Sequence, residues 1–225
     1  PDFARFHPTT MMETGYDILF FWVARMILMT TYATGQIPFN KVYLHGMVKD
    51  RRGKKMSKSH PETMIDPLDM IPKYGTDALR LAMLVGTSPG NDQRLYEEKI
   101  AGYRNFVNKI WNISRFTMMN IPASSQIKEP VAKTTADRWI LSRLSQLITQ
   151  TDYHLADYRY SQAIEDLYDF TWHEFADWYI ESAKYEENKA DILVYALTTL
   201  LRLFHPFIPF VTEYIWGLLA KHVKA

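Results

Sequence analysis

Apolar residues recur every three or four positions through the second half of the chain, the spacing that gathers them on one face of a helix. This spacing predicts helices over 139–148, 161–187 and 192–204, and a last helix that begins near Val211. A longer amphipathic helix is predicted over 95–120. Helices in this order, joined by short connections, are typical of an antiparallel bundle.

The first part of the chain has a different pattern. A helix is predicted over 16–32, with Thr14 as its N-cap and Gly35 at its end. Residues 42–48 are apolar and partly β-branched, which predicts a buried strand. The Gly46 inside this strand lets another group approach the backbone closely.

Capping residues mark two more helix starts. Asp66 and Pro67 combine an N-cap with a proline at the first helical position. Thr76 is placed to cap a helix over 77–85, and the Gly, Pro, Asn and Asp residues of 86–94 predict a loop. The elements together predict an α/β plus all-α fold in three parts: an α/β part over 1–85, a helical connector over 86–135 and an antiparallel bundle over 136–225.

Composition excludes several classes of protein. The 225 residues are 47% hydrophobic, 14% aromatic and 23% charged, which is close to an ordinary globular chain and unlike a disordered or collagen-like one. Without cysteine there is no disulfide framework and no thiolate metal site, and we predict no metal site. The most apolar stretch, 18–29, contains Arg25 and is too short for a bilayer, so we expect no membrane partner. The chain opens with Pro1 and no signal peptide, which suggests a piece of a longer cytoplasmic protein.

Charge is unevenly distributed although the net charge is only +1. Residues 1–135 carry 18 Lys and Arg against 12 Asp and Glu, whereas residues 136–190 carry 5 against 11. The first part therefore suits an anionic partner, and most of the second is an acidic, solvated surface.

The basic loop 51–59 is the sharpest chemical feature. It places five cations and two hydroxyls on one short segment after the predicted strand. One interpretation is a solvated hairpin tip. The other is a phosphate site, because Met56 suits a pocket and two lysines with two hydroxyls can neutralise a triphosphate.

The segment Lys55-Met56-Ser57-Lys58-Ser59 matches the signature loop of the class I aminoacyl-tRNA synthetases. Its surroundings resemble the valyl-tRNA synthetases in order and spacing, at Thr14-Gly15-Tyr16-Asp17 with Phe20-Phe21-Trp22 and at His45-Gly46-Met47-Val48. The resemblance continues over 102–106, 136–141, 176–179 and 205–210, and so covers nearly the whole chain.

The resemblance assigns each part of the chain. It implies that 1–85 form the second half of a class I, Rossmann-like catalytic domain, that 86–135 form a stem-contact segment and that 136–225 form the anticodon-binding bundle. The chain departs from the family at His60-Pro61-Glu62, where a Lys-Gly-Asn is usual. The family's other nucleotide-binding signature and its editing insertion are both absent from these residues. We therefore expect the fragment to be inactive alone and without editing.

The resemblance also implies a set of site residues. The family activates valine with ATP and Mg²⁺ and then transfers it to tRNA(Val). Lys58 first and Lys55 second would stabilise charge on the phosphates. The remaining residues that resemble ATP- or adenylate-binding positions are Ser57, Ser59, Gly15, Asp17, His45, Gly46 and Val48. Trp22 resembles a wall of the amino-acid pocket. Without the resemblance, Trp22 reads as core, His45 as a satisfied strand histidine and Asp17 as a first-turn helix acid.

Candidates for tRNA contact lie on the predicted helices. Anticodon bases are read by aromatic stacking and by arginine planes, for which Arg138, Arg143 and Tyr160 are placed. Arg104 and Lys109, with their neighbours Lys99 and Arg115, suit the phosphate backbone. The competing interpretation is that the tryptophans of the bundle are core residues.

Two other functions remain open. The chain could be a non-catalytic tRNA-binding fragment or paralogue, because it lacks the first nucleotide-binding signature. It could also be an ordinary α/β protein with a basic tip, whose five-residue match arose by chance. We expect a monomer whose first part exposes apolar surface, since half of the predicted sheet is missing.

Overall fold

The contacts of the chain divide it into two compact units. The computed structural model describes residues 1–56, 64–122 and 125–223. One unit comprises 1–64 with 86–95, and the other comprises 65–85 with 96–225. Residues 65–85 thus pack with the bundle, although they were grouped with the α/β part above. The division into three functional parts at 85 and 135 stays a prediction.

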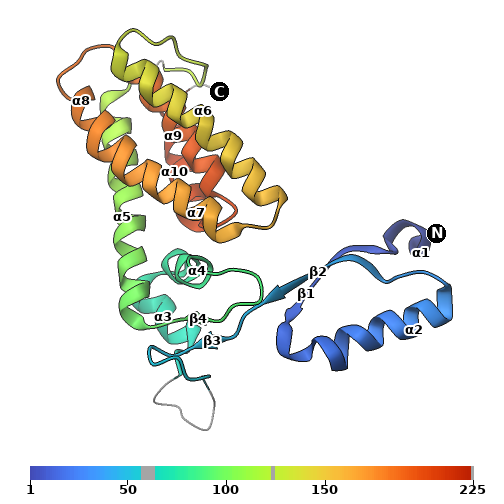
Figure 1. Ribbon diagram of the computed structural model, residues 1–225. Helices are drawn as coiled ribbons and strands as arrows, with labels where there is room; N and C mark the ends of the chain where they lie inside the picture. Colours follow the sequence, from blue (N-terminus) through green and yellow to red (C-terminus); the bar gives the residue numbers. More distant parts are fainter. Residues whose placement is uncertain (57–63, 123–124, 224–225) are drawn as a thin grey trace. The chain divides into compact units, whose positions relative to one another are not determined.

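The first unit is built around a parallel strand pair (Figure 1). Its elements are α1 (Asp2–Phe6), β1 (Thr9–Gly15), the 3₁₀ helix η1 (Tyr16–Ile18), the π-helix η2 (Leu19–Val23), α2 (Ala24–Thr34), β2 (Phe39–His45), β3 (Val48–Lys49) and β4 (Gln93–Arg94). β1 and β2 pair from Thr9–Phe39 to Gly15–His45, and α2 forms the crossover that a parallel pair requires. A second parallel pair joins β3 to β4.

The strand predicted over 42–48 is found with different bounds, but the prediction that it is buried is wrong. Strand β2 begins earlier, at Phe39, which is its buried residue, and Val42 is exposed. Parallel sheets normally have both faces covered by helices, and an apolar run is then buried on both sides. Among the described residues, β2 has β1 as its strand partner and one crossover helix, so its apolar side chains stay partly open to water.

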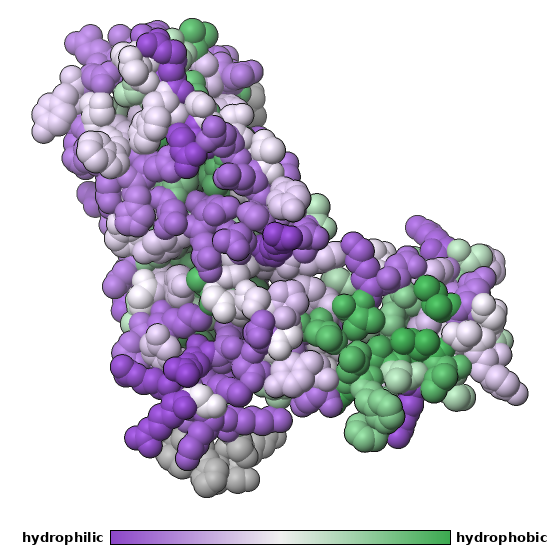
Figure 2. All heavy atoms as spheres, viewed as in Figure 1, coloured by the Kyte–Doolittle hydropathy of each residue, from purple (hydrophilic) through white to green (hydrophobic). Residues whose placement is uncertain are grey.

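The exposed apolar surface expected for this part is present. Phe20 is 76% exposed, and Phe21, Leu28 and Met29 are exposed on the same helical run. Figure 2 shows the hydrophobic side chains gathered over this unit. Trp22 is 53% exposed, so its interpretation as a core residue is also wrong.

The second unit is helical. Its elements are α3 (Pro67–Tyr74), α4 (Thr76–Leu84), α5 (Glu97–Asn120), α6 (Thr135–Ala156), α7 (Tyr160–Asp169), the π-helix η4 (Phe170–Ile180), α8 (Glu181–Ala183), α9 (Ala190–Phe204) and α10 (Pro209–Leu219). The helices predicted in this part are all found, with ends that shift by a few residues. The helix predicted over 161–187 is one helical run whose centre is π-helical.

Helix α9 is the centre of the bundle. Its buried residues are distributed around the helix, from Ile192 to Phe204, because α5, α6, α7 and α10 all contact it. Phe106 of α5 lies beside Phe204, with ring centroids 5.6 Å apart. The tryptophans contribute less than expected: Trp178 is 71% exposed, so its interpretation as core is wrong.

Local capping explains where several helices begin. Asp66 caps α3 as predicted, since its carboxylate accepts the Leu68 N–H at 2.8 Å. Thr14 and Thr76 are not the caps predicted for them. Thr14 is buried in β1, and the glycine before Thr76 is the N-cap of α4 and makes no side-chain capping bond. A helical segment follows each threonine as predicted, but neither threonine is its N-cap. A residue with a capping preference does not determine the strand or turn that precedes the helix.

Helix α4 is tied to the start of α10 by two side chains. The carboxylate of Asp77 accepts the backbone N–H of Val211 at 2.7 Å, which caps α10 from another helix. Arg80 donates to the carbonyl oxygens of Phe207 and Pro206 at 2.7 and 3.1 Å. These bonds satisfy backbone groups at a proline break in the helical run, and so they hold 65–85 in the bundle unit.

A buried ion pair closes the other end of the bundle. Asp137 is 1% exposed and Lys189 is 5% exposed, and their Oδ1 and Nζ atoms are 2.7 Å apart. Asp137 also accepts the Tyr179 hydroxyl at 2.9 Å and the Thr134 backbone N–H at 2.9 Å, which completes a capping box at α6. Burial alone raises the pKa of Asp137, but these hydrogen bonds, led by that of Lys189, outweigh it and hold the pKa at about 2.

We predict that Asp137→Asn destabilises the chain by roughly 1.5–3 kcal/mol, because the buried Lys189 ammonium loses a charged acceptor and keeps Glu186 as its other carboxylate partner. Urea unfolding followed by tryptophan fluorescence measures the change. Asp191→Asn is the matched control, since Asp191 pairs with Lys128 on the exposed surface at 3.5 Å. That variant is expected to lose about 1 kcal/mol or less. Equal losses in the two variants would contradict the prediction.

The ionised state of Asp137 also predicts a pH dependence. A carboxyl whose folded pKa lies below its unfolded value stabilises the fold above the unfolded pKa, and the stabilisation is lost as pH falls toward the folded pKa. We expect the difference in unfolding free energy between the wild type and Asp137→Asn to be constant above pH 5 and to shrink by about 2 kcal/mol on approach to pH 2. Urea titrations at pH 6 and pH 3 measure it. A difference independent of pH would argue against an ionised Asp137 at pH 3.

Candidate active site

The junction of β1 and η1 brings together three of the predicted site residues. Gly15 ends β1 opposite His45 of β2, and Asp17 follows in the first turn of η1. A Cβ placed on Gly15 would lie 2.7 Å from Asp17 Oδ1 and 3.4 Å from His45 Cε1. Glycine thus lets the Asp17 carboxylate and the His45 ring lie close to its backbone, and a Cβ here would push the carboxylate aside.

His45, the last residue of β2, lies near two oxygen atoms. Its Nδ1 lies 2.9 Å from the Gly46 carbonyl oxygen, and a carbonyl can only accept, so Nδ1 carries a proton. Its Nε2 lies 3.6 Å from Glu13 Oε1 of β1. The hydrogen bond to Gly46 thus orients His45 at the carboxyl end of the parallel strands, the edge at which ligands bind in open α/β sheets.

The close approach expected at Gly46 is made by the chain itself. A Cβ on Gly46 would lie 1.7 Å from the carbonyl oxygen of Asn91, so only glycine fits beside this backbone. In the next short strand, β3, Val48 is paired with Gln93 of β4. Successive residues of a parallel strand direct their backbone groups to alternate sides, so those of Val48 point away from β4 while those of Met47 and Lys49 face it.

A tight turn leads into Lys55, the first residue of the signature segment 55–59. The Asp50 carboxylate is buried and accepts the Lys54 N–H at 2.8 Å, and the Gly53 N–H closes the turn on the Asp50 carbonyl at 3.0 Å. Gly53 has a φ of 80°, which favours glycine. After the turn, Lys55 bridges back to Lys49, and its Nζ lies 3.8 Å from Asp17 Oδ2.

The structure therefore brings Lys55 and Asp17 to one place although 38 positions separate them in the sequence. Ser57, Lys58 and Ser59 lie outside the described residues. Trp22 lies on η2 with its side chain exposed. An ammonium beside a carboxylate, next to a strand edge with outward backbone groups, offers complementary charge to a ligand that carries both an anion and a cation.

Asp92, which the sequence pattern did not single out, has three partners in this site. Its Oδ1 accepts the Met47 N–H at 2.7 Å and the Tyr16 hydroxyl at 3.0 Å, and its Oδ2 pairs with the Lys49 ammonium. The Lys49 ammonium and then the Met47 N–H lower the pKa of Asp92, while the carboxylate raises the pKa of the Tyr16 hydroxyl. The sequence offered one signal for Asp92, an Asn-Asp pair that follows Pro-Gly in the predicted loop. This pattern predicts a turn, but it does not indicate which residues the carboxylate contacts.

The residues of the bundle predicted to contact tRNA differ in their exposure and in their pairing with other side chains. Arg138 of α6 is exposed and donates to the Thr135 hydroxyl at 3.1 Å. Arg143 forms a bidentate pair with Glu174 at 2.7 Å, which joins α6 to η4 and raises the pKa of Arg143. Tyr160 is partly buried at the start of α7, where burial raises its pKa.

The connector cations divide in the same way. Arg104 of α5 is exposed. Lys109 pairs with Asp177 of η4 at 2.9 Å and lies 5.0 Å from the ring centroid of Trp172. Arg104 and Arg138 therefore present their charge to solvent. Lys109 and Arg143 are instead paired with the carboxylates of Asp177 and Glu174 in the bundle.

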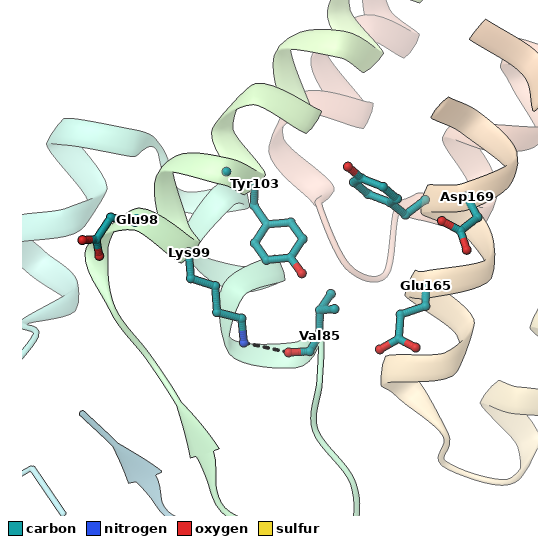
Figure 3. A pocket seen from close by; sticks show the side chains of 8 residues that line it. Val85, Glu98, Lys99, Tyr103, Glu165 and Asp169 are labelled. Atoms are coloured by element: carbon teal, nitrogen blue, oxygen red, sulfur yellow. Dashed lines mark hydrogen bonds between the residues drawn. The ribbon is translucent and has the colours of Figure 1, made fainter. Parts of the chain in front are cut away.

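Lys99 lies at a cavity of about 370 Å³ between α5 and α7 (Figure 3). Its Nζ donates to the Val85 carbonyl oxygen at 2.8 Å, and burial lowers its pKa. Tyr103 and Glu165 face the same space, and burial, followed by the charge of Glu165, raises the pKa of Tyr103 to about 12. This placement differs from the open phosphate-binding role considered for Lys99, because its ammonium is held against the protein.

Membrane-spanning helices and metal sites are two further features that the described residues could contain. No helix among them is apolar over a length that would cross a bilayer. Within the same residues, no three or more His, Cys, Asp and Glu side chains gather where they could hold a metal ion.

Comparison of folds relates the chain to solved tRNA synthetases. A LeuRS of Agrobacterium radiobacter K84, solved in a ternary complex with tRNA and LeuAMS, superposes with a TM-score of 0.78 at 21% identity, over 94% of this chain and 27% of that one. A Mycobacterium tuberculosis methionyl-tRNA synthetase bound by methionyl-adenylate gives 0.74 at 19% identity, over 97% of this chain and 45% of that one. Both confirm the predicted fold, a segment of a class I synthetase followed by a helical bundle.

Comparison of sequences gives nearer relatives. Valine–tRNA ligases of Dehalococcoides mccartyi and Geobacter sulfurreducens are 44% and 48% identical over 99% and 96% of this chain. The chain spans 26% of the length of each of these relatives. Residues 1–96 match the family of class I tRNA synthetases for Ile, Leu, Met and Val, and residues 137–224 match the anticodon-binding domain of tRNA ligases. The chain therefore belongs to the class I tRNA synthetases, as a segment of the valine–tRNA ligase type.

Proposed function

We propose that this chain is the part of a valine–tRNA ligase that carries the second phosphate-binding loop and the anticodon-binding helices. The observation that carries the proposal is the approach of Lys55 to Asp17 beside the glycine–histidine contact at the end of β1 and β2. These residues come from segments far apart in the sequence and converge at the edge where α/β folds bind ligands. The names of the relatives supply the amino acid and the tRNA.

In the proposed first step, the valine carboxylate attacks the α-phosphorus of ATP and pyrophosphate leaves. Negative charge grows on the bridging and leaving oxygens, and a fixed cation at that place lowers the barrier by a few kcal/mol. Lys55 is our candidate for this role among the residues that the structure describes. Lys58, which lies outside them, is the other candidate. Mg²⁺ enters with the phosphates of ATP as part of the substrate.

Asp17 suits the cationic side of the same ligand. Its carboxylate is 40% exposed and close to the backbone of Gly15, so it can accept from a ribose hydroxyl or from the ammonium of valine. The outward backbone groups of Val48, next to His45 and Gly46, suit the adenine edge. Trp22 stays our candidate for a wall of the valine pocket.

The bundle supplies the proposed tRNA surface. Arg138 and Arg104 are our first candidates because their guanidinium groups are exposed. Arg143 and Lys109 would have to exchange a protein carboxylate for a phosphate, and Tyr160 would offer its ring to a base. Such contacts act through phosphate charge and base stacking. We also keep a monomeric, cytoplasmic enzyme as part of the proposal.

The alternative of a non-catalytic tRNA-binding fragment is not favoured. A fragment that only bound tRNA would have no use for Lys55 and Asp17 paired at this strand edge. We keep the three functional parts, 1–85, 86–135 and 136–225, as part of the proposal.

The test of activation uses the full-length enzyme and valine-dependent exchange of pyrophosphate into ATP. We expect Lys55→Ala to lower kcat by about 100-fold, because a charge that stabilises the transition state acts mainly on turnover. Lys54→Ala is the matched control, since Lys54 is the adjacent exposed lysine, and it should stay within about twofold of the wild type. Normal exchange by Lys55→Ala would refute its role. Exchange that does not depend on valine would refute the proposed substrate.

The test of tRNA contact measures the affinity for tRNA(Val) against salt concentration. We expect Arg138→Gln to weaken binding and to reduce the slope of log affinity against log salt by about 1, as one phosphate contact predicts. Lys128→Gln, which removes an exposed cation of the linker, should leave the slope unchanged. An unchanged slope for Arg138→Gln would place this arginine outside the interface.

A further inference from the structure

The segment 90–95 runs alongside the segment 44–49 throughout its length. It donates three backbone hydrogen bonds: from Gly90 to Leu44 at 2.8 Å, from Gln93 to Met47 at 3.0 Å and from Leu95 to Lys49 at 2.9 Å. Gly46 permits this approach, because the Asn91 carbonyl occupies the place of a Cβ. The segment is thus fitted to the carboxyl end of β2 and to the strand that leads into the basic loop.

The Asp92 carboxylate completes this contact with side-chain bonds. Met47 is held on both backbone groups, since its N–H is bound by Asp92 and its carbonyl by the Gln93 N–H. The same carboxylate binds the Tyr16 hydroxyl on η1 and the Lys49 ammonium on β3. One side chain therefore joins three stretches of the chain that the sequence keeps far apart.

Two of these stretches carry the charged pair of the proposed site. Tyr16 is the residue before Asp17, and Lys49 is the residue to which Lys55 bridges. The 3.8 Å between Asp17 and Lys55 thus depends on two short attachments that meet at Asp92. Loss of the carboxylate would free η1 and β3 to move with respect to each other.

We propose that Asp92 is a positioning residue for the activation step, which holds η1 and β3 so that Asp17 and Lys55 face one bound substrate. The inference rests on the proposed function, because it assigns Asp92 a task only if Lys55 acts on ATP. It goes beyond a structural role in one respect: the effect of Asp92 on turnover passes through Lys55. A displacement of about 1 Å in a catalytic group is enough to lower a rate by about 100-fold.

The experiment measures valine-dependent pyrophosphate exchange by the full-length enzyme in a double-mutant cycle. Asp92→Asn keeps the shape of the side chain and removes the charge that holds Lys49. We expect it to lower kcat by about 100-fold with a smaller change in the KM for valine. In the Lys55→Ala background the same substitution should cost only a few-fold, because the group that it positions is gone.

The matched control is Asp2→Asn, which makes the same chemical change on an exposed aspartate in the first turn of α1. It should leave kcat within about twofold of the wild type. Tyr16→Phe removes one hydroxyl from the Asp92 cluster and should lower kcat less than Asp92→Asn while the enzyme stays folded. If Asp92→Asn proves unstable in thermal unfolding, the cycle of Tyr16→Phe with Lys55→Ala decides the question.

Normal turnover by Asp92→Asn would overturn the inference. So would an equal fold-loss with and without Lys55, which would mean that Asp92 acts independently of the lysine. The two proposals fail in different ways: a wild-type enzyme without valine-dependent exchange contradicts the proposed function, whereas an active wild type with an additive cycle contradicts only the role of Asp92.

Discussion

The Met47 peptide is the constraint on which the candidate site depends. It lies between two paired segments, where β2 has ended and β3 has not begun, so its N–H and its carbonyl both need partners from the segment alongside. The carboxylate of Asp92 and the N–H of Gln93 supply them. Because Asp92 also takes the Tyr16 hydroxyl, the solution to a local hydrogen-bonding problem fixes η1 as well. The approach of Asp17 to Lys55 follows from that arrangement.

The bundle was predictable from the sequence because its information is local. A helix that buries one face repeats its apolar residues at the helical period, and α5 and α6 each carry that repeat over many turns. Asp66 before a proline marks a helix start whose partners lie within two residues. Features that involve another element were not predictable in this way. The carboxylate of Asp77 caps α10 from a distance of 134 positions, and nothing near Asp77 announces it.

The candidate site was predicted only as far as a family motif reached. The motif supplied Gly15, Asp17 and Lys55, and the structure brings these together. Asp92 carries no motif, and its role comes from three partners that lie 43 to 76 positions away. Burial failed for a related reason: the apolar run of β2 indicates a strand with both faces covered, but coverage depends on neighbours that the run itself does not contain.

Two ion pairs, one in each unit, hold their charged groups in different physical states, and this difference bears on the proposed function. In the bundle, Asp137 is buried with Lys189, so the pair cannot exchange partners without exposing a desolvated charge. In the first unit, Lys55 and Asp17 are partly exposed and 3.8 Å apart, so either can leave the other for a ligand at small cost. In the reaction that we propose, Lys55 has to release Asp17 in order to meet a phosphate, and a loose, exposed pair allows this. The role that we propose for Asp92 is to keep this exchangeable pair in register through its bonds to Tyr16 and Lys49.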